Sequence, residues 1–353
     1  MKTNPITPQG KEIARDTTLD AYRALAMLHI VCVIHIFYLL GLGHETARSA
    51  LLFEMPAIFF IAGASQSLSR NDKGLRETVV NRAWRVLAPF YVSLAVIYAW
   101  MALMTVFSEP TEKFNADITQ LTLRDVLKTL ATGGCPHIPF YGYTWFISCY
   151  FIISCSLPLQ KKIIKKIPIW AYLALMVAVV AAITPLHFPG EIEIKNLPVY
   201  NFFFIAGYAY YRRYSLKALV AVCVVTVAFT VYGFAQGFMM PMQDHKFPAD
   251  IFFLIFGTAW LTVLALALRK VHLPYNRILK IWNVRGYNIY LYQLFSFYAV
   301  YRLTDPWIAT VGSETLQFFI YAALVFITAT VLSYVTFAIE KYVISKAKSL
   351  LNT

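Results

Sequence analysis

The stretch from Leu19 to Leu42, LDAYRALAMLHIVCVIHIFYLLGL, decides the fold because it is long and apolar enough to cross a lipid bilayer. It nevertheless carries Arg23, His29 and His35. A charged side chain near the middle of a membrane costs about 2.5–3.5 kcal/mol on insertion scales, so such residues usually face a polar interior and mark a functional site. Arg23 alone is also compatible with a snorkelling anchor at a helix end, but two histidines lie deeper in the same segment.

The composition of the whole chain agrees with this first segment. Of its 353 residues, 59% are hydrophobic and 14% are charged, whereas a soluble domain carries about 25% charged residues. The five cysteines are scattered, with neither the pattern of a disulfide framework nor the spacing of a zinc site, so we predict no metal site. The chain is therefore expected to be an all-α polytopic membrane protein.

Ten segments are apolar enough to be transmembrane helices, given that a span needs about 20 apolar residues and fewer inside a bundle. They cover residues 19–42, 49–68, 84–107, 144–160, 168–187, 197–211, 217–240, 250–268, 285–303 and 316–339. We divide the chain into an N-terminal tail (1–18), a membrane domain (19–341) and a C-terminal tail (342–353).

Basic residues gather at both ends of the chain and in the connections that follow the even-numbered spans. Because short cytoplasmic segments of membrane proteins are enriched in Lys and Arg, this asymmetry predicts that both termini are cytoplasmic. The net charge of +13 does not indicate a nucleic-acid partner, since the basic residues are dispersed over six short segments and form no single patch. We expect a multi-pass protein of the cell (plasma or inner) membrane, with the lipid bilayer as its partner.

Short motifs follow one another along the membrane domain. They are LDAYRALA at 19–26, FEMPAIFFIAG at 53–63, RAWR at 82–85 followed by LAPFY at 87–91, WF at 145–146, FFIAGY at 203–208, YNIYLY at 287–292, SY at 333–334 and IEK at 339–341. As a set and in this order, they resemble the acyltransferase-3 family of integral-membrane acyltransferases, which acylate sugars on cell-surface polysaccharides.

The resemblance implies transfer of an acyl group, most simply acetyl from acetyl-coenzyme A, to a sugar hydroxyl, with acyl-coenzyme A as co-substrate and no permanently bound cofactor. It points to His35 as the general base, a role that typically supplies about 10²- to 10⁴-fold in rate. Arg23 would bind the donor phosphates or the developing oxyanion. Arg82 and Arg85 would bind the phosphates of coenzyme A, although anchoring at the cytoplasmic face also explains two arginines there.

Three features depart from the family pattern. Eleven residues separate Arg23 from His35 where the family has ten, and a separation of twelve positions places the two about 120° apart on an ideal helix. If both residues serve one site, we expect a π-bulge to absorb the extra residue; His29 is the alternative base. Glu54 stands where the family commonly has a basic or neutral polar residue. Gln293 stands where many members have histidine.

The carbohydrate acceptor is expected to contact Glu54, Trp145 and His137. A solvated loop explains His137 equally well, and an interfacial aromatic belt explains Trp145. Two other functions remain open from the sequence. One is transfer of succinyl instead of acetyl, and the other is a polysaccharide exporter or another transporter without acyl-transfer activity.

Overall fold

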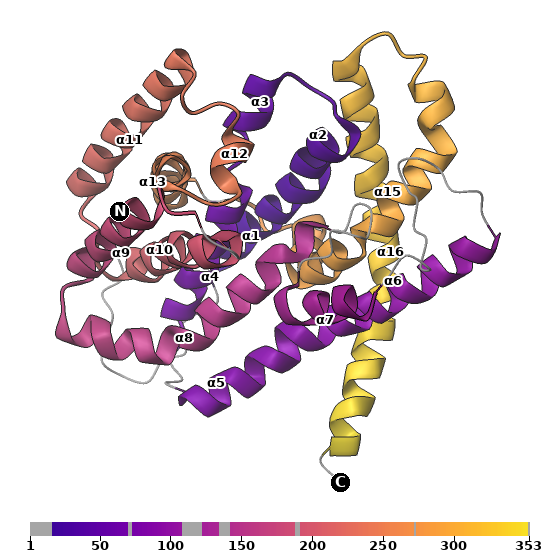
Figure 1. Cartoon of the computed structure of the whole chain (residues 1–353), viewed down its shortest axis with the longest axis horizontal. Helices are drawn as coiled ribbons and strands as arrows, with labels where there is room; N and C mark the ends of the chain where they lie inside the picture. The colour runs from indigo at the N-terminus through magenta and orange to yellow at the C-terminus, as the bar shows by residue number, and fades with distance from the viewer. Residues whose placement is uncertain are drawn as a thin grey trace.

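The computed structural model describes residues 16–69, 73–107, 122–133, 142–187, 191–271 and 273–351. Figure 1 shows these residues as helices that pack into one bundle, and no strand occurs among them. Most of the predicted N-terminal tail and His137 lie outside the described residues. The secondary structure therefore agrees with the all-α prediction.

The helices follow one another with short connections. In chain order they are α1 (Thr17–His29), η1 (Ile30–Ile34), α2 (His35–Leu40), α3 (Glu45–Ala50), α4 (Glu54–Ser67), α5 (Leu75–Arg82), η2 (Ala83–Leu87), α6 (Ala88–Phe107), α7 (Leu123–Thr132), η4 (Gly142–Trp145), α8 (Phe146–Lys166), α9 (Ile169–Ile183), α10 (Glu191–Arg213), α11 (Leu216–Gln236), α12 (Met242–Lys246), α13 (Ile251–Lys270), α14 (Arg277–Val284), α15 (Gly286–Ile308) and α16 (Glu314–Leu351). Of the labelled η elements, η1 and η2 are π-helical and η4 is a 3₁₀ turn.

Seven helical segments of the described chain are long and apolar enough to cross a membrane. They are Thr17–Tyr38, Glu45–Ser67, Leu75–Leu103, Gly142–Lys166, Leu216–Gln236, Ile251–Lys270 and Glu314–Leu350. The other three predicted spans fall on α9, which is apolar but shorter, on α10 and on α15. The protein is thus an all-α polytopic membrane protein, while the count of ten spans and the cytoplasmic termini stay predictions.

The last span continues as one helix beyond the predicted membrane domain. α16 runs to Leu351, through most of the predicted C-terminal tail, and its end projects beyond the rest of the bundle in Figure 1. Near that end, the Lys348 ammonium lies 5.2 Å from the centre of the Trp84 ring. The predicted C-terminal tail is therefore helical as far as Leu351 and contacts η2 through Lys348.

Helices α4 and α10 cross with their backbones in contact, at a glycine on each helix. A Cβ atom added to Gly63 would lie 1.8 Å from the carbonyl oxygen of Phe204, and one added to Gly207 would lie 1.9 Å from that of Phe60. Small residues that allow such close approach are typical of helix crossings in membranes. The crossing fixes α4, which carries the candidate site residue Glu54, against α10.

The Gly207→Ala variant is expected to be destabilised by about 1–3 kcal/mol or more, because the added methyl meets backbone atoms that cannot rotate away. The measurement is the temperature at which half of the detergent-purified protein is lost from the monodisperse peak in size-exclusion chromatography. Gly74→Ala is the matched control, since nothing lies within 4 Å of its added Cβ. Equal midpoints for the two variants would contradict the tight crossing.

Candidate functional site

The first span is not a uniform α-helix, and its irregularity lies between Arg23 and His35. α1 passes into the π-helical segment η1, and the backbone N–H of His35 donates to the carbonyl of Ile30, five residues back. This wider turn absorbs the extra residue between the two side chains, as the spacing predicts. Twelve positions still correspond to about 18 Å along a helix, so Arg23 and His35 lie at different depths of the bundle.

His35 is held by a glutamine from α15. Its Nδ1 lies 2.7 Å from Oε1 of Gln293, whose Nε2 donates to the carbonyl oxygen of Tyr290 at 3.0 Å. A carbonyl oxygen can only accept a hydrogen bond, so the Gln293 group that bonds to the Tyr290 carbonyl is the amide NH₂. The amide oxygen of Gln293 therefore faces His35, and Nδ1 of the imidazole donates to it. The other ring nitrogen, Nε2, then carries the basic lone pair.

Aromatic rings enclose the same imidazole. The ring of Tyr143 lies 5.0 Å and that of Tyr290 lies 5.9 Å from His35, measured between ring centres. The Tyr290 hydroxyl donates to the carbonyl oxygen of Tyr143 at 2.5 Å, and Phe146 packs edge-on against Tyr290. These contacts join α15 to the start of α8 and leave His35 partly buried in largely apolar surroundings.

A mainly apolar cavity of about 280 Å³ leads toward this histidine. Its lining includes Met27 and Ile30 on the first span, Met55 on α4 and Tyr290, the residue whose ring faces His35. Arg82 and Arg85 belong to the same lining, together with other polar residues. One cavity therefore lies against both the two arginines and a ring that contacts His35.

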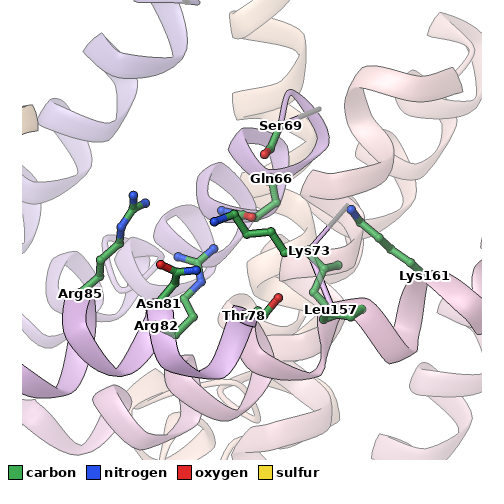
Figure 2. Close-up of a pocket in the computed structure, with 10 residues that line it drawn as sticks. Gln66, Ser69, Lys73, Thr78, Asn81, Arg82, Arg85, Leu157 and Lys161 are labelled. Atoms are coloured by element: carbon green, nitrogen blue, oxygen red, sulfur yellow. The ribbon is translucent and has the colours of Figure 1, made fainter. Parts of the chain in front are cut away.

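A second, more polar cavity of about 280 Å³ adjoins the first, and Arg82 and Arg85 line both. Figure 2 shows the two arginine side chains extending from the same side of the helix formed by α5 and η2, with Lys73 and Lys161 farther along the cavity. Within the described parts of the chain, neither arginine forms an ion pair with a carboxylate. Their charges are thus available to an anionic ligand at the junction of the cavities.

Arg23 also lines the apolar cavity, where it joins three helices. Its guanidinium donates to Asp20 at 3.0 Å, to Asn283 of α14 at 3.1 Å and to the hydroxyl of Ser65 on α4. A snorkelling anchor would extend toward water, but this guanidinium is bonded to neighbouring helices. Its depth places it beside the path toward His35, at some distance from the histidine itself.

Glu54 lies at the other end of α4, about 17 Å from Ser65 along the helix axis. It forms a buried ion pair with Lys246 of α12, and the two residues are 2% and 5% exposed. Trp145 packs against Phe247, the residue after Lys246, with ring centres 4.9 Å apart. Two of the three predicted acceptor contacts, Glu54 and Trp145, are thus gathered near Lys246; the third, His137, lies outside the described residues.

His29, the alternative base, contacts other residues than His35 does. Its Nε2 is 2.8 Å from the carbonyl oxygen of Leu51, and its ring stacks on Phe53 at 4.6 Å. Neither histidine is among the described residues that line the apolar cavity, but Tyr290, whose ring centre lies 5.9 Å from that of His35, is one of them. Leu51 and Phe53, which contact His29, are not. The contact with Tyr290 is the geometric reason to prefer His35 as the candidate base.

A family model described as an acyltransferase domain, that of the acyltransferase-3 family, matches residues 16–338. The chain belongs to the acyltransferase-3 family. This match covers nearly all of the described bundle, including both cavities and His35, and establishes a membrane acyltransferase whose acceptor is not an aminoacyl group. No curated protein and no solved structure was found to match the chain significantly.

Sequence reasoning missed several members of the site. Gln293 was visible only as a departure from the family histidine, and Tyr290 only as part of a motif. Lys246 gave no signal at all, because its partner Glu54 lies 192 residues away in the chain. The sequence offered one indication of such a partner: Glu54 is a carboxylate within a predicted span, and a buried carboxylate needs a cation nearby.

Proposed function

We propose that this acyltransferase moves an acyl group, most simply acetyl, from acyl-coenzyme A to a hydroxyl of a cell-surface or exopolysaccharide sugar. The observation that carries the proposal is the pair of adjoining cavities: Arg82 and Arg85 line both of them, and Tyr290, next to His35, lines only the apolar one. The polar, cationic cavity suits the phosphates of this donor, and the apolar cavity that adjoins it suits the acyl-pantetheine arm.

The arginines are suited to the phosphates for a geometric reason. A guanidinium presents several N–H donors in a rigid fork and binds phosphate oxygens in pairs, with stronger bonds than neutral groups make. Arg82 and Arg85 lie on the predicted cytoplasmic side, where a soluble polyanion would arrive. Arg23 lines the apolar cavity between them and His35, so we assign it to the donor arm. Its axial distance of about 18 Å from His35 argues against the oxyanion role.

In the proposed reaction, Nε2 of His35 takes the proton of the acceptor hydroxyl as its oxygen attacks the thioester carbonyl carbon. The C–S bond then breaks, the ester forms, and the imidazolium returns the proton to the thiolate, which leaves as coenzyme A thiol. Throughout, Gln293 accepts from Nδ1–H and keeps the ring in the tautomer with a basic Nε2. The surrounding aromatic rings restrict water, which would otherwise hydrolyse the thioester.

The acceptor is proposed to approach from the side of the Glu54–Lys246 pair, opposite the arginines. Glu54 and Trp145 are its expected contacts, together with His137. A carboxylate oxygen and an aromatic face suit sugar hydroxyls and sugar rings respectively. One oxygen of Glu54, Oε2, is buried with no hydrogen-bond partner in the described structure, so a hydroxyl that reached it would satisfy a buried acceptor.

The Arg82→Gln variant is expected to raise the KM for acetyl-coenzyme A by about 10- to 100-fold, because hydrogen bonds to charged groups contribute about 1.5–3 kcal/mol each. Its kcat at saturating donor should change little, since Arg82 contacts no reacting atom. The measurement is transfer of radiolabelled acetyl to endogenous polysaccharide in membranes that contain each variant.

Arg76→Gln is the matched control for Arg82→Gln. Arg76 lies on the same helix, is exposed and lines neither cavity, so its variant should keep the wild-type KM. If the wild type neither consumes nor binds acetyl-coenzyme A, the proposed donor is wrong; succinyl-coenzyme A would then be tested in the same assay. Polysaccharide flux into proteoliposomes without donor consumption would support an exporter instead.

A further inference from the structure

A third cavity, of about 220 Å³, lies beyond the polar one. Four lysines line it, Lys73 before α5 and Lys161, Lys162 and Lys165 on the last turns of α8, and no acidic residue does so among those that the structure describes. Lys73 and Lys161 also line the polar cavity that contains Arg82 and Arg85. Figure 2 shows these two lysines approaching from different segments, Lys73 from the connection before α5 and Lys161 from α8. We name the third cavity the lysine groove.

The positive charge of the lysine groove is only partly compensated. Lys73 forms an ion pair of 2.6 Å with Glu77, in which both side chains are well exposed, so that pair is weak. Lys161 is partly buried, with its ammonium 5.9 Å from the centre of the Tyr208 ring. Lys162 and Lys165 are exposed. Lys162 and Lys165 form no ion pair with a carboxylate among the described residues, so these two lysines give the groove a surplus of positive charge.

Membrane topology explains why lysines occur at this end of α8, but it does not explain why they line a cavity. A purely topogenic lysine needs only to reach water. Lys166, the next residue in the run, does so: it is exposed and lines none of the three cavities. The arrangement of Lys73 and Lys161, which line two adjoining cavities, is what points to a ligand.

The three cavities follow one another in a fixed order. The apolar cavity near His35 shares Arg82 and Arg85 with the polar cavity, which in turn shares Lys73 and Lys161 with the lysine groove. Coenzyme A thioesters have a matching order of parts: an acyl-pantetheine arm, a diphosphate, and an adenosine that carries a 3′-phosphate. Building on the donor in the proposed function, we propose that the lysine groove binds the 3′-phosphate and so makes the enzyme select coenzyme A thioesters over thioesters that lack this group.

The test compares acetyl-coenzyme A with acetyl-3′-dephospho-coenzyme A as donors for the wild type and for Lys161→Gln. The wild type should show a kcat/KM about 10- to 100-fold lower for the dephospho donor, because it loses charge-assisted hydrogen bonds. Lys161→Gln should lower kcat/KM for acetyl-coenzyme A by a larger factor than for the dephospho donor, which keeps only the contacts of the polar cavity, so that the preference falls toward one. This double cycle isolates the interaction between Lys161 and the 3′-phosphate. Lys166→Gln is the matched control and should keep the wild-type preference.

Different results would overturn the 3′-phosphate site and the proposed acyl transfer. Equal kcat/KM for the two donors in the wild type, with transfer intact, would overturn the 3′-phosphate site and leave acyl transfer standing. If Lys161→Gln slowed both donors equally, and only in vesicles with anionic lipid, the groove would hold a lipid phosphate and the inference would be wrong. Titration of the purified protein with coenzyme A and with 3′-dephospho-coenzyme A provides a readout independent of transfer, and absence of binding by either would refute both proposals.

Discussion

The His35→Ala variant is expected to lose about 10²- to 10⁴-fold in kcat for acyl transfer while its affinity for coenzyme A stays near that of the wild type. General acid–base catalysis typically contributes a factor of this size. Donor binding should persist, because the arginines that we assign to the phosphates line the polar cavity, which does not include His35. The measurement pairs radiolabelled acetyl transfer by reconstituted protein with titration of the same sample by coenzyme A.

His29→Ala is the control for this experiment. Both histidines lie on the first span, but His29 is bonded to the Leu51 carbonyl and stacked on Phe53, away from the cavity lining. Its loss should lower the thermal stability and leave kcat within a few fold of the wild type. The assignment of the base would be reversed if His29→Ala lost transfer and His35→Ala kept it.

The sequence predicted the first span well because its evidence was local. Apolar length indicated a membrane helix. The spacing of Arg23 and His35, one residue longer than in the family that the chain resembles, indicated a π-bulge, which the structure has as η1. Both conclusions concern helix geometry within one segment. The close crossing of α4 and α10 could not be predicted in this way. It joins two spans that are far apart in the sequence, with Gly63 against Phe204 and Gly207 against Phe60.

The partners of the site residues could not be predicted for the same reason. Gln293 is 258 residues from His35, and Lys246 is 192 residues from Glu54. No periodicity relates residues at such separations; only the packing of the helices brings them together. The lysine run at the end of α8 shows a further limit, because a topogenic cluster and a cavity lining have the same composition and differ only in where each side chain lies.

The Lys246→Met variant is expected to be destabilised by about 3–5 kcal/mol, because it leaves the carboxylate of Glu54 buried without its cation. The double variant Glu54→Gln/Lys246→Met should recover most of that loss, since it removes both charges from the bundle. The measurement is the folded fraction of each purified variant as SDS is added in mild detergent, read from far-UV circular dichroism. Equal destabilisation of the single and double variants would show that the interaction between the two charges contributes little to stability.

The same double variant tests whether the ion pair has a structural role or a role in acceptor binding. If Glu54 serves only to fix α12 against α4, a stable double variant should transfer acetyl at close to the wild-type rate. If Glu54 binds the acceptor, as we propose, the double variant should fold yet show a raised KM for the carbohydrate, with the KM for acetyl-coenzyme A unchanged. Because the polar cavity, which includes Gln66, and the Glu54–Lys246 pair lie toward opposite ends of α4, a change confined to the acceptor would also support entry of the two substrates from opposite sides of His35.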